Sequence, residues 1–158
     1  MRHCAIGTYK NTCILKLILK FILQLGDPTN TGKHSEPADA ENPIKVSKKD
    51  YKPSSVGESD ISRGTVFAVK NPNREDRLGS QFFICLDESY SEALKDTEKY
   101  VKLGKVVEGL EAIRVIETEL SGQNKLSSKG RPKGKWKVEP WVQDVVIHYN
   151  PFAHCSDT

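Results

Sequence analysis

Paired cysteines are missing from this sequence, and their absence narrows the chemistry that the chain can carry. The four cysteines stand at positions 4, 13, 85 and 155, and none has the C-x-x-C spacing typical of zinc sites and thioredoxin-like redox sites. The sequence therefore predicts no metal site and no cofactor. Isolated thiols suit a reducing compartment, so we expect a nuclear or cytoplasmic location.

A strong excess of one charge sign is also missing. The net charge is only +3, which is too small to predict nucleic-acid binding from overall charge. Positive charge gathers locally, at Lys125, Lys129, Arg131, Lys133, Lys135 and Lys137. One hypothesis is RNA contact through residues 125–137, with Lys133 and Lys135 on phosphates and Trp136 stacking on a base. The alternative is a solvated polar loop.

A long uninterrupted apolar run is the third absence. The run at 13–25, CILKLILKFILQL, is shorter than the roughly 20 residues that cross a bilayer, so no membrane contact is predicted. Its polar residues Lys16, Lys20 and Gln24 recur every four positions, as on one stripe of a helix. Two buried strands joined by a tight bend fit the same residues, because Ile and Phe favour strands. Periodicity alone leaves both structures open.

The rest of the chain favours antiparallel β-structure with few helices. Short strands are predicted at 64–69, 80–86, 100–107 and 141–148. A turn-rich connection is expected at 70–79 and a short helix at 91–96. The clearest helix is 109–120, because Leu110, Ile113, Ile116 and Leu120 fall on one face. Long polar loops are expected at 29–62 and 121–138.

Four separated motifs, in the right order, resemble the cyclophilin family of peptidyl-prolyl cis-trans isomerases. FILQLGDPT at 21–29 resembles F-M-x-Q-G-G-D-x-T, and GSQFFIC at 79–85 matches a strand motif of the family. GTVFAVKN at 64–71 and LGKVVEGLEAI at 103–113 resemble two further family motifs. The ending VVIHYNPFA is similar to that of small spliceosome-associated cyclophilins.

The resemblance implies a mainly β fold, a closed antiparallel barrel of eight strands capped by two helices. It also implies that 13–28 is two strands around a bend. The cyclophilin-like domain would occupy 13–152, after an atypical segment at 1–12 and before a tail at 153–158. A complete member has about two strands and a helix before the position of Cys13, so we expect an incomplete barrel, either truncated at the N-terminus or with its first element replaced. Open sheet edges of this kind invite strand addition by a partner.

The resemblance also implies a site for X-Pro peptides. Lys16 falls where the family has its catalytic arginine, and Gln24 falls on the glutamine that orients it. The implied substrate-binding residues are Phe21, Ile22, Val69, Lys70, Asn71, Phe83 and Tyr100. Lysine keeps the positive charge but lacks the planar fork of arginine.

We therefore expect a proline-peptide binder with weakened isomerase activity. The alternative is a non-catalytic scaffold or assembly module of a spliceosomal or other ribonucleoprotein complex. Its partners would be proline-containing proteins, spliceosomal proteins or RNA.

Overall fold

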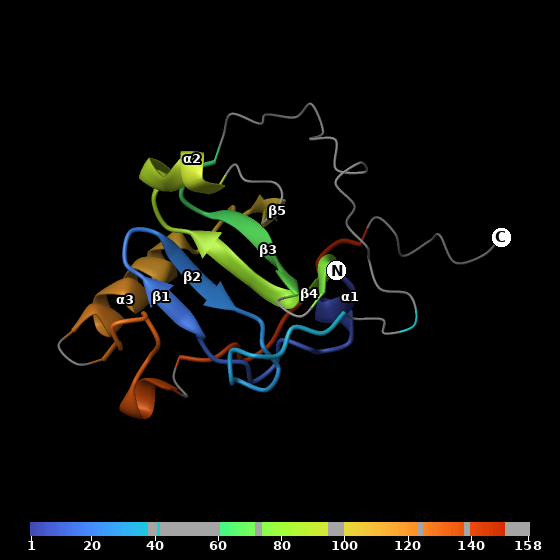
Figure 1. The fold of residues 1–158 in the computed structure, drawn as a ribbon, viewed down its shortest axis with the longest axis horizontal. Coiled ribbons are helices and arrows are strands. Elements are labelled where there is room, and N and C mark those ends of the chain that lie inside the picture. The colour runs from blue at the N-terminus through green and yellow to red at the C-terminus, as the bar shows by residue number, and fades with distance from the viewer. Residues whose placement is uncertain are drawn as a thin grey trace.

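The computed structural model describes the chain in segments, namely residues 1–37, 41, 61–71, 74–94, 100–122, 125–137 and 140–150. These segments contain one antiparallel sheet of order β1-β2-β4-β3-β5 (Figure 1). Its strands are β1 (Lys16–Ile18), β2 (Ile22–Leu25), β3 (Thr65–Asn71), β4 (Arg74–Cys85) and β5 (Tyr100–Lys105). The helices are α1 (Arg2–Ala5), α2 (Ser91–Leu94) and α3 (Leu110–Ser121), with 3-10 turns η1 (Glu88–Tyr90) and η2 (Gly134–Lys137). None of the helices in these segments is long and apolar enough to cross a membrane.

The apolar run at 13–25 forms a β-hairpin, which confirms the two-strand prediction and rules out the helix. Lys20 lies in the bend with a left-handed backbone (φ 58°), and Ile18 pairs with Ile22 on either side. Alternate residues of β2 enter opposite faces of the sheet: Ile22 packs on one face and Leu23 on the other. This alternation explains why a run with so few polar residues is a central strand and not a helix.

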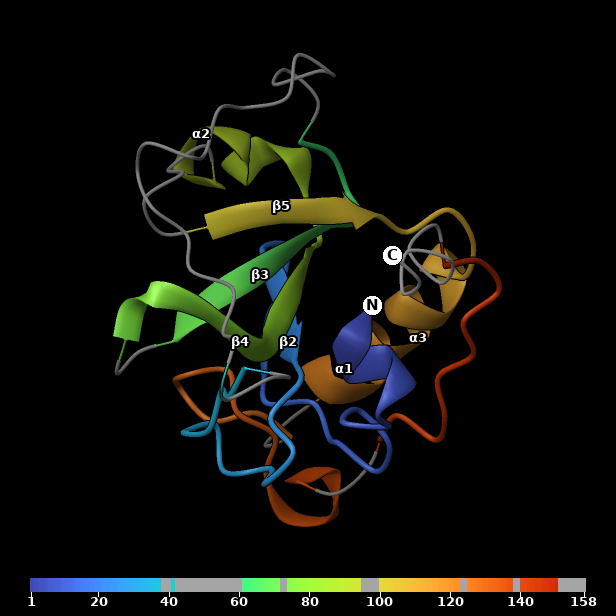
Figure 2. The same cartoon turned by 90° about the vertical axis from the view of Figure 1, so that its right-hand side faces the viewer.

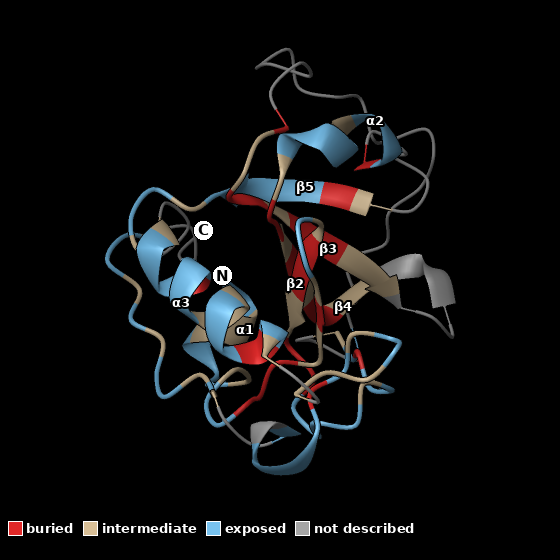
Figure 3. Cartoon of the chain, turned by 90° about the vertical axis from the view of Figure 1, so that its left-hand side faces the viewer, coloured by how far each residue is buried: buried red, intermediate tan, exposed pale blue. Residues whose placement is uncertain are grey.

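Each face of the sheet carries its own apolar cluster. The first cluster lies against α3 and contains Ile14, Leu17, Leu23, Leu86, Ile113 and Leu120. The second lies on the other face and contains Ile22, Ile61, Phe67, Phe83, Cys85 and Leu94, the last from α2. In Figure 1 α3 and α2 lie on different sides of the strands, and in Figure 3 the buried positions follow β2, β3 and β4.

The helix α3 forms where its sequence predicts. Gly109 precedes it in a left-handed conformation (φ 84°), and Ile113 and Leu120 are buried against the sheet. The guanidinium of Arg63 joins three elements by donating to the Leu86 carbonyl oxygen at 2.6 Å and to the Glu117 carboxylate. The helix is thereby fixed to the ends of β3 and β4.

The predicted strand at 141–148 is wrong. These residues are irregular apart from a single bridge between Cys13 and Trp141. The pattern of alternating residues is present, but Trp141 is 49% exposed and Val146 is 71% exposed, so no sheet face receives them. Strand propensity alone does not create a strand without a neighbour to pair with.

The expected turn-rich connection at 70–79 is also largely wrong, because β3 continues to Asn71 and β4 begins at Arg74. Backbone pairing carries this hairpin beyond the apolar part of the sequence, with register shifts near Lys70. The short helix predicted at 91–96 is present as α2, and the strand at 100–107 ends at Lys105. Most of the predicted loop at 29–62, and the tail at 153–158, lie outside the described residues.

The mainly β fold is confirmed, and the sheet of the described segments fits an incomplete barrel. Across the described segments the sheet has five strands and is not closed by hydrogen bonds between β1 and β5. Figure 2 shows β5 crossing one end of the sheet, with the other strands descending from it. The edge strand β1 is partly covered, because the Leu17 N–H donates to the Gly130 carbonyl oxygen at 2.7 Å.

Candidate functional site

The two residues predicted to act in catalysis lie in one row across the sheet. Lys16 of β1 is the cross-strand partner of Gln24 of β2, and Gln24 is the partner of Phe83 of β4. Directly opposed residues in an antiparallel pair point to the same face, and neighbouring strands lie about 4.8 Å apart. A cation, an amide and an aromatic ring therefore stand side by side on one face, over about 10 Å.

The row continues into an aromatic cluster. Phe83 stacks on Phe67, its partner on β3, with ring centroids 5.1 Å apart and planes inclined by 16°. The ring of Tyr100 meets Phe83 edge-on at 5.2 Å. Phe83 is only 2% exposed and Phe67 is equally buried. The apolar centre of the site is thus covered by neighbouring rings.

Five of the residues predicted to bind substrate are gathered by this face of the sheet. Ile22 and Phe83 are buried members of the apolar cluster, and Phe21, Val69 and Tyr100 pack against it while remaining partly exposed. Phe21 also contacts the ring of Tyr90 at 4.7 Å. The partly exposed side of this cluster is therefore formed by Phe21, Val69 and Tyr100, and its buried member Phe83 adjoins Gln24.

The remaining predicted site residues either lie away from this row or have side chains that the structure does not describe. Lys70 is half-buried where the β3–β4 register shifts, so it does not continue the regular alternation that leads to Phe83. Asn71 ends β3, and its side chain lies outside the described part of the structure. Lys133 is exposed just before η2 and Lys135 is exposed within it, and the side chain of Trp136 is not among those that the structure describes.

A chain of amides supports Gln24. Its Nε2 donates to Oε1 of Gln81 at 2.7 Å, and Nε2 of Gln81 donates to the carbonyl oxygen of His34 at 2.8 Å. The backbone N–H of Gln81 donates to the hydroxyl of Ser35 at 3.2 Å. Gln81 is 4% exposed, so its hydrogen bonds are shielded from water. The position of Gln24 therefore depends on the segment that carries His34 and Ser35.

That segment is organised by the carboxylate of Asp27, which is fully buried. It accepts hydrogen bonds from the backbone N–H groups of Thr29, Gly32, Lys33 and His34, and from the hydroxyls of Thr29 and Thr31. Burial alone would raise the pKa of this carboxyl, but the hydrogen bonds from Thr29, His34 and Gly32 lower it below its usual value. Asp27 is an ionised anchor for the turn, not a proton donor or acceptor of the site.

Three further residues that shape this site are not among those predicted from the sequence: Phe67, Gln81 and Asp27. The sequence places Phe67 only within a predicted strand. Because Phe67 lies between Val66 and Ala68, strand alternation puts its side chain on the face opposite to theirs. Gln81 is two residues before Phe83, so strand alternation places both on one face. In the sequence Asp27 is only part of a predicted turn. Its role depends on the folded turn, which brings the N–H groups of Gly32 and His34 to its carboxylate.

Comparison with known proteins gives one consistent family. Residues 1–142 match the family model described as cyclophilin type peptidyl-prolyl cis-trans isomerase/CLD. The chain is 34% identical over 156 residues to peptidyl-prolyl cis-trans isomerase 10 of Caenorhabditis elegans, covering 95% of this chain and 80% of that protein. It is also 34% identical over 152 residues to human peptidyl-prolyl cis-trans isomerase-like 3, with 95% and 80% coverage.

Solved structures agree with these sequence matches. A crystal structure of a Cryptosporidium parvum cyclophilin type peptidyl-prolyl cis-trans isomerase, determined in the presence of the dipeptide Ala-Pro, superposes with a TM-score of 0.59. The two chains are 27% identical, and the match covers 94% of this chain and 81% of the other.

Proposed function

The chain belongs to the cyclophilin-type peptidyl-prolyl cis-trans isomerase family, and from this premise we propose that it binds X-Pro peptides beside Lys16, Gln24 and Phe83 but isomerises them slowly. The observation that carries the proposal is the cross-strand row itself, which sets a cation and an amide next to the apolar cluster around Phe83. The resemblance assigns these roles to the same three positions. We place this activity in the nucleus or the cytoplasm.

The reaction asks little covalent chemistry of the protein. Rotation about the X-Pro bond is opposed by amide resonance, with a barrier of about 18–20 kcal/mol. A site lowers this barrier by binding the twisted amide more tightly than the planar one. An apolar surface for the proline ring and a cationic donor for the prolyl nitrogen meet that need, and Lys16 is the cation of the row.

Two features of the row support weakened catalysis. The ammonium of Lys16 is a point charge on a flexible stem, so it does not fix the twisted amide with the planar fork of an arginine. Phe83 is 2% exposed beneath Phe67 and Tyr100, so a proline ring reaches it only by displacing a neighbouring ring. Losing one preorganised donor costs about 3 kcal/mol in a transition state, or roughly a hundredfold in rate.

Exchange NMR on an Ala-Pro peptide tests the proposal directly. We expect the wild-type chain to accelerate exchange weakly, and Lys16→Arg to raise the rate by about tenfold or more because the fork is restored. Lys10→Arg, at an exposed residue outside the row, is the matched control and should leave the rate unchanged. Peptide resonances that do not shift on addition of protein would reject peptide binding, and equal rates for Lys16→Arg and wild type would reject the role of Lys16.

A second candidate function is a non-catalytic assembly module, in line with the similarity of the tail to spliceosome-associated cyclophilins. It is supported by exposed apolar side chains near the C-terminal end of the description, with Trp141 49%, Val146 71% and Tyr149 78% exposed. Trp141 also lines a hollow of about 500 Å³ against Val115 and Leu120 of α3. Affinity purification should recover splicing proteins, and recovery of chaperones alone would contradict this function.

RNA contact through residues 125–137 stays a prediction. It requires an affinity that falls steeply with salt and is lost when Lys133 and Lys135 are neutralised. A fluorescent single-stranded RNA titrated at 50 and 200 mM salt would measure both effects.

A further inference from the structure

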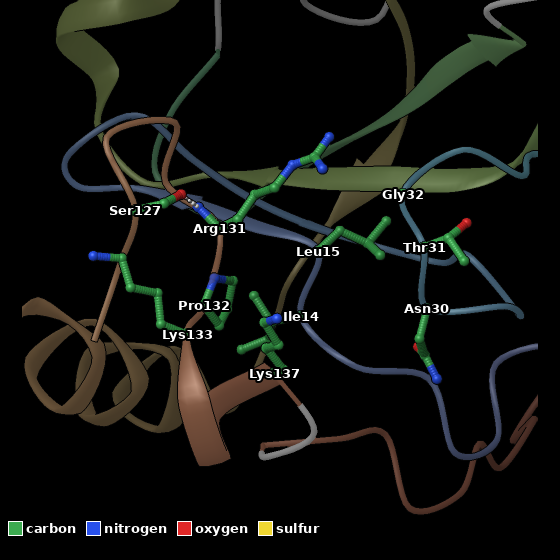
Figure 4. A pocket seen from close by; sticks show the side chains of 10 residues that line it. All are labelled: Ile14, Leu15, Asn30, Thr31, Gly32, Ser127, Arg131, Pro132, Lys133 and Lys137. Carbon is green, nitrogen blue, oxygen red and sulfur yellow. Dashed lines mark hydrogen bonds between the residues drawn. The ribbon is translucent and has the colours of Figure 1, made fainter. Parts of the chain in front are cut away.

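The edge strand β1 forms one wall of a hollow whose other wall is the turn at 126–131. The hollow has a volume of about 680 Å³ and is lined by Lys16, Leu17, Ile18, Leu19, Gln24 and residues 126–131. It therefore opens directly beside the row described above. A second hollow of about 400 Å³ shares Ser127 and Arg131 with it and continues toward Thr31 (Figure 4).

The described lining of both hollows is positively charged. The cations are Lys16, Lys129, Arg131, Lys133 and Lys137, and neither described lining includes an Asp or a Glu. The whole chain has 24 Lys and Arg against 21 Asp and Glu, so without these five it would carry 19 against 21, a net charge of −2. The two linings therefore hold a local excess of five positive charges in a chain whose net charge is +3, and such an excess attracts an anion.

These cations have no partner within the described part of the chain. The ion pairs described there join Arg63 to Glu117 and Lys125 to Glu119, and neither involves the five. In Figure 4 the Arg131 side chain reaches over Leu15, whereas that of Lys133 extends away from it. Lys16, Lys129 and Arg131 are therefore the cations that line the hollow next to Gln24.

The turn that carries Lys129 and Arg131 is held in place before any ligand binds. The Gly130 N–H donates to the Ser127 carbonyl oxygen at 2.9 Å, and the Arg131 N–H donates to the Ser127 hydroxyl at 3.0 Å. Gly130 has a left-handed backbone (φ 72°) and lies so close to β1 that a Cβ atom there would be 2.4 Å from the Leu17 carbonyl oxygen. Pro132, which follows Arg131, is buried. Such preorganisation reduces the entropy that a bound anion must overcome.

We propose that this hollow is a subsite for an anionic residue of the peptide, a phosphoserine, phosphothreonine, glutamate or aspartate, a few residues from the proline. The inference rests on the proposed function, because it places the proline ring near Phe83. Lys16 is about 10 Å from Phe83 across two strand spacings, and an extended peptide covers that distance in about three residues. The preferred substrate is an X-Pro peptide with a phosphate or carboxylate at that separation.

A peptide fits this hollow better than RNA does. Single-stranded nucleic acids bind on aromatic platforms within a continuous basic groove. The described linings of the two hollows contain no aromatic residue, and β1 with the bend after it contributes Leu17, Ile18 and Leu19 to one of them. A short apolar wall beside a few cations is suited to the aliphatic and anionic side chains of one peptide.

Calorimetric titration of the full chain with matched peptides tests the subsite. One series has the order Xaa-Ala-Ala-Pro and a second has Pro-Ala-Ala-Xaa, where Xaa is serine, phosphoserine, glutamate or lysine. In one series the phosphoserine peptide should bind about tenfold tighter than the serine peptide, because two exposed charge contacts are gained. The lysine peptide should bind more weakly than serine. Phosphoserine preference should fall below pH 6 as the phosphate gains a proton, whereas glutamate preference should persist.

The variants separate this inference from the proposed function. Lys129→Gln with Arg131→Gln should abolish the anionic preference and leave the Kd of the serine peptide unchanged. Lys10→Gln with Lys105→Gln removes the same charge at exposed residues elsewhere and should keep the preference. Binding of serine peptides without anionic preference overturns the subsite alone, and no binding of any peptide overturns the proposed function with it. Tighter, Arg131-dependent binding of a uridine decamer than of phosphopeptide would overturn the subsite in favour of RNA.

Discussion

Replacing Asp27 with asparagine should destabilise the whole fold, although the two side chains have nearly the same size. Asp27 accepts six hydrogen bonds, two on Oδ1 from Thr29 and four on Oδ2 from residues 31–34. Asparagine has one oxygen, and it satisfies more donors when that oxygen faces the N–H groups of 32–34. Its NH₂ group then faces the Thr29 N–H, which is left without an acceptor.

The size of the effect follows from these contacts. A buried N–H without an acceptor costs about 1–3 kcal/mol. The bonds that remain also lose the assistance of the negative charge, which roughly doubles the strength of a hydrogen bond. Together these terms give a loss of about 3 kcal/mol in the free energy of unfolding. With a urea dependence of about 2 kcal/mol per molar, the midpoint of unfolding should fall by about 1.5 M.

The effect of Asp27→Asn should depend on pH in one direction. The pKa of the Asp27 carboxyl is raised by burial but lowered further by its hydrogen bonds, so it lies below the unfolded value of about 3.9. The stability that the carboxylate contributes is therefore complete above the unfolded pKa and is lost as pH falls through the folded pKa. The difference between wild type and Asp27→Asn should be constant from pH 7 to about pH 5 and should shrink below pH 4.

Urea unfolding followed by tryptophan fluorescence at pH 7, 5 and 3 measures both quantities. Asp144→Asn is the matched control, because Asp144 is exposed and accepts one local hydrogen bond, from the Val145 N–H. A midpoint for Asp27→Asn within about 0.3 M of wild type at pH 7, or a difference that stays the same at pH 3, would refute the account of the turn.

Three further variants probe other contacts. Glu117→Gln should lower the free energy of unfolding by about 1–3 kcal/mol, because it leaves the guanidinium of Arg63 with a weaker acceptor between the sheet and α3. Urea unfolding measures this loss, and a midpoint equal to that of wild type would contradict the link. Gly130→Ala should detach the turn at 126–131 from β1, because the added methyl group would collide with the Leu17 carbonyl oxygen. The Leu17 N–H, which donates to the Gly130 carbonyl oxygen, should then exchange faster with solvent, and unchanged protection there would reject the contact. Leu120→Ala should lower the free energy of unfolding by about 2–5 kcal/mol, since the side chain is fully buried and its removal leaves a cavity. A melting temperature equal to that of wild type would contradict this, because it would mean that the surrounding residues fill the cavity.

The sequence predicted the parts of the fold that local pattern and family motifs specify. The helix α3 follows from apolar spacing around Ile113 and Leu120, and the motif around Gln24 decided between helix and hairpin for the run at 13–25. The strand expected at 141–148 failed because its pattern is local, whereas a strand needs a neighbour. Val146 is 71% exposed for that reason.

The juxtaposition of three candidate residues could be predicted from the sequence, but the packing around them could not. The order of motifs placed Lys16, Gln24 and Phe83 together, and the strand register does bring them into one row. That Phe67 lies flat on Phe83 depends on the pairing of β3 with β4, which no local pattern specifies. The docking of the turn at 126–131 on β1 likewise depends on a long-range contact through Gly130.

The hydrogen bonds from Gln24 to Gln81 and from Gln81 to His34 all run in one direction, because the last acceptor is a carbonyl oxygen that cannot donate. The carbonyl oxygen of His34 only accepts, so Gln81 must turn its NH₂ toward it and its oxygen toward Gln24. Gln24 must then turn its own NH₂ inward, which leaves its oxygen as the outward end of the chain. A main-chain carbonyl two hydrogen bonds away thus fixes the side-chain oxygen of Gln24 as the outward end of the chain, where it accepts from the ammonium of Lys16 or from an N–H of a bound peptide.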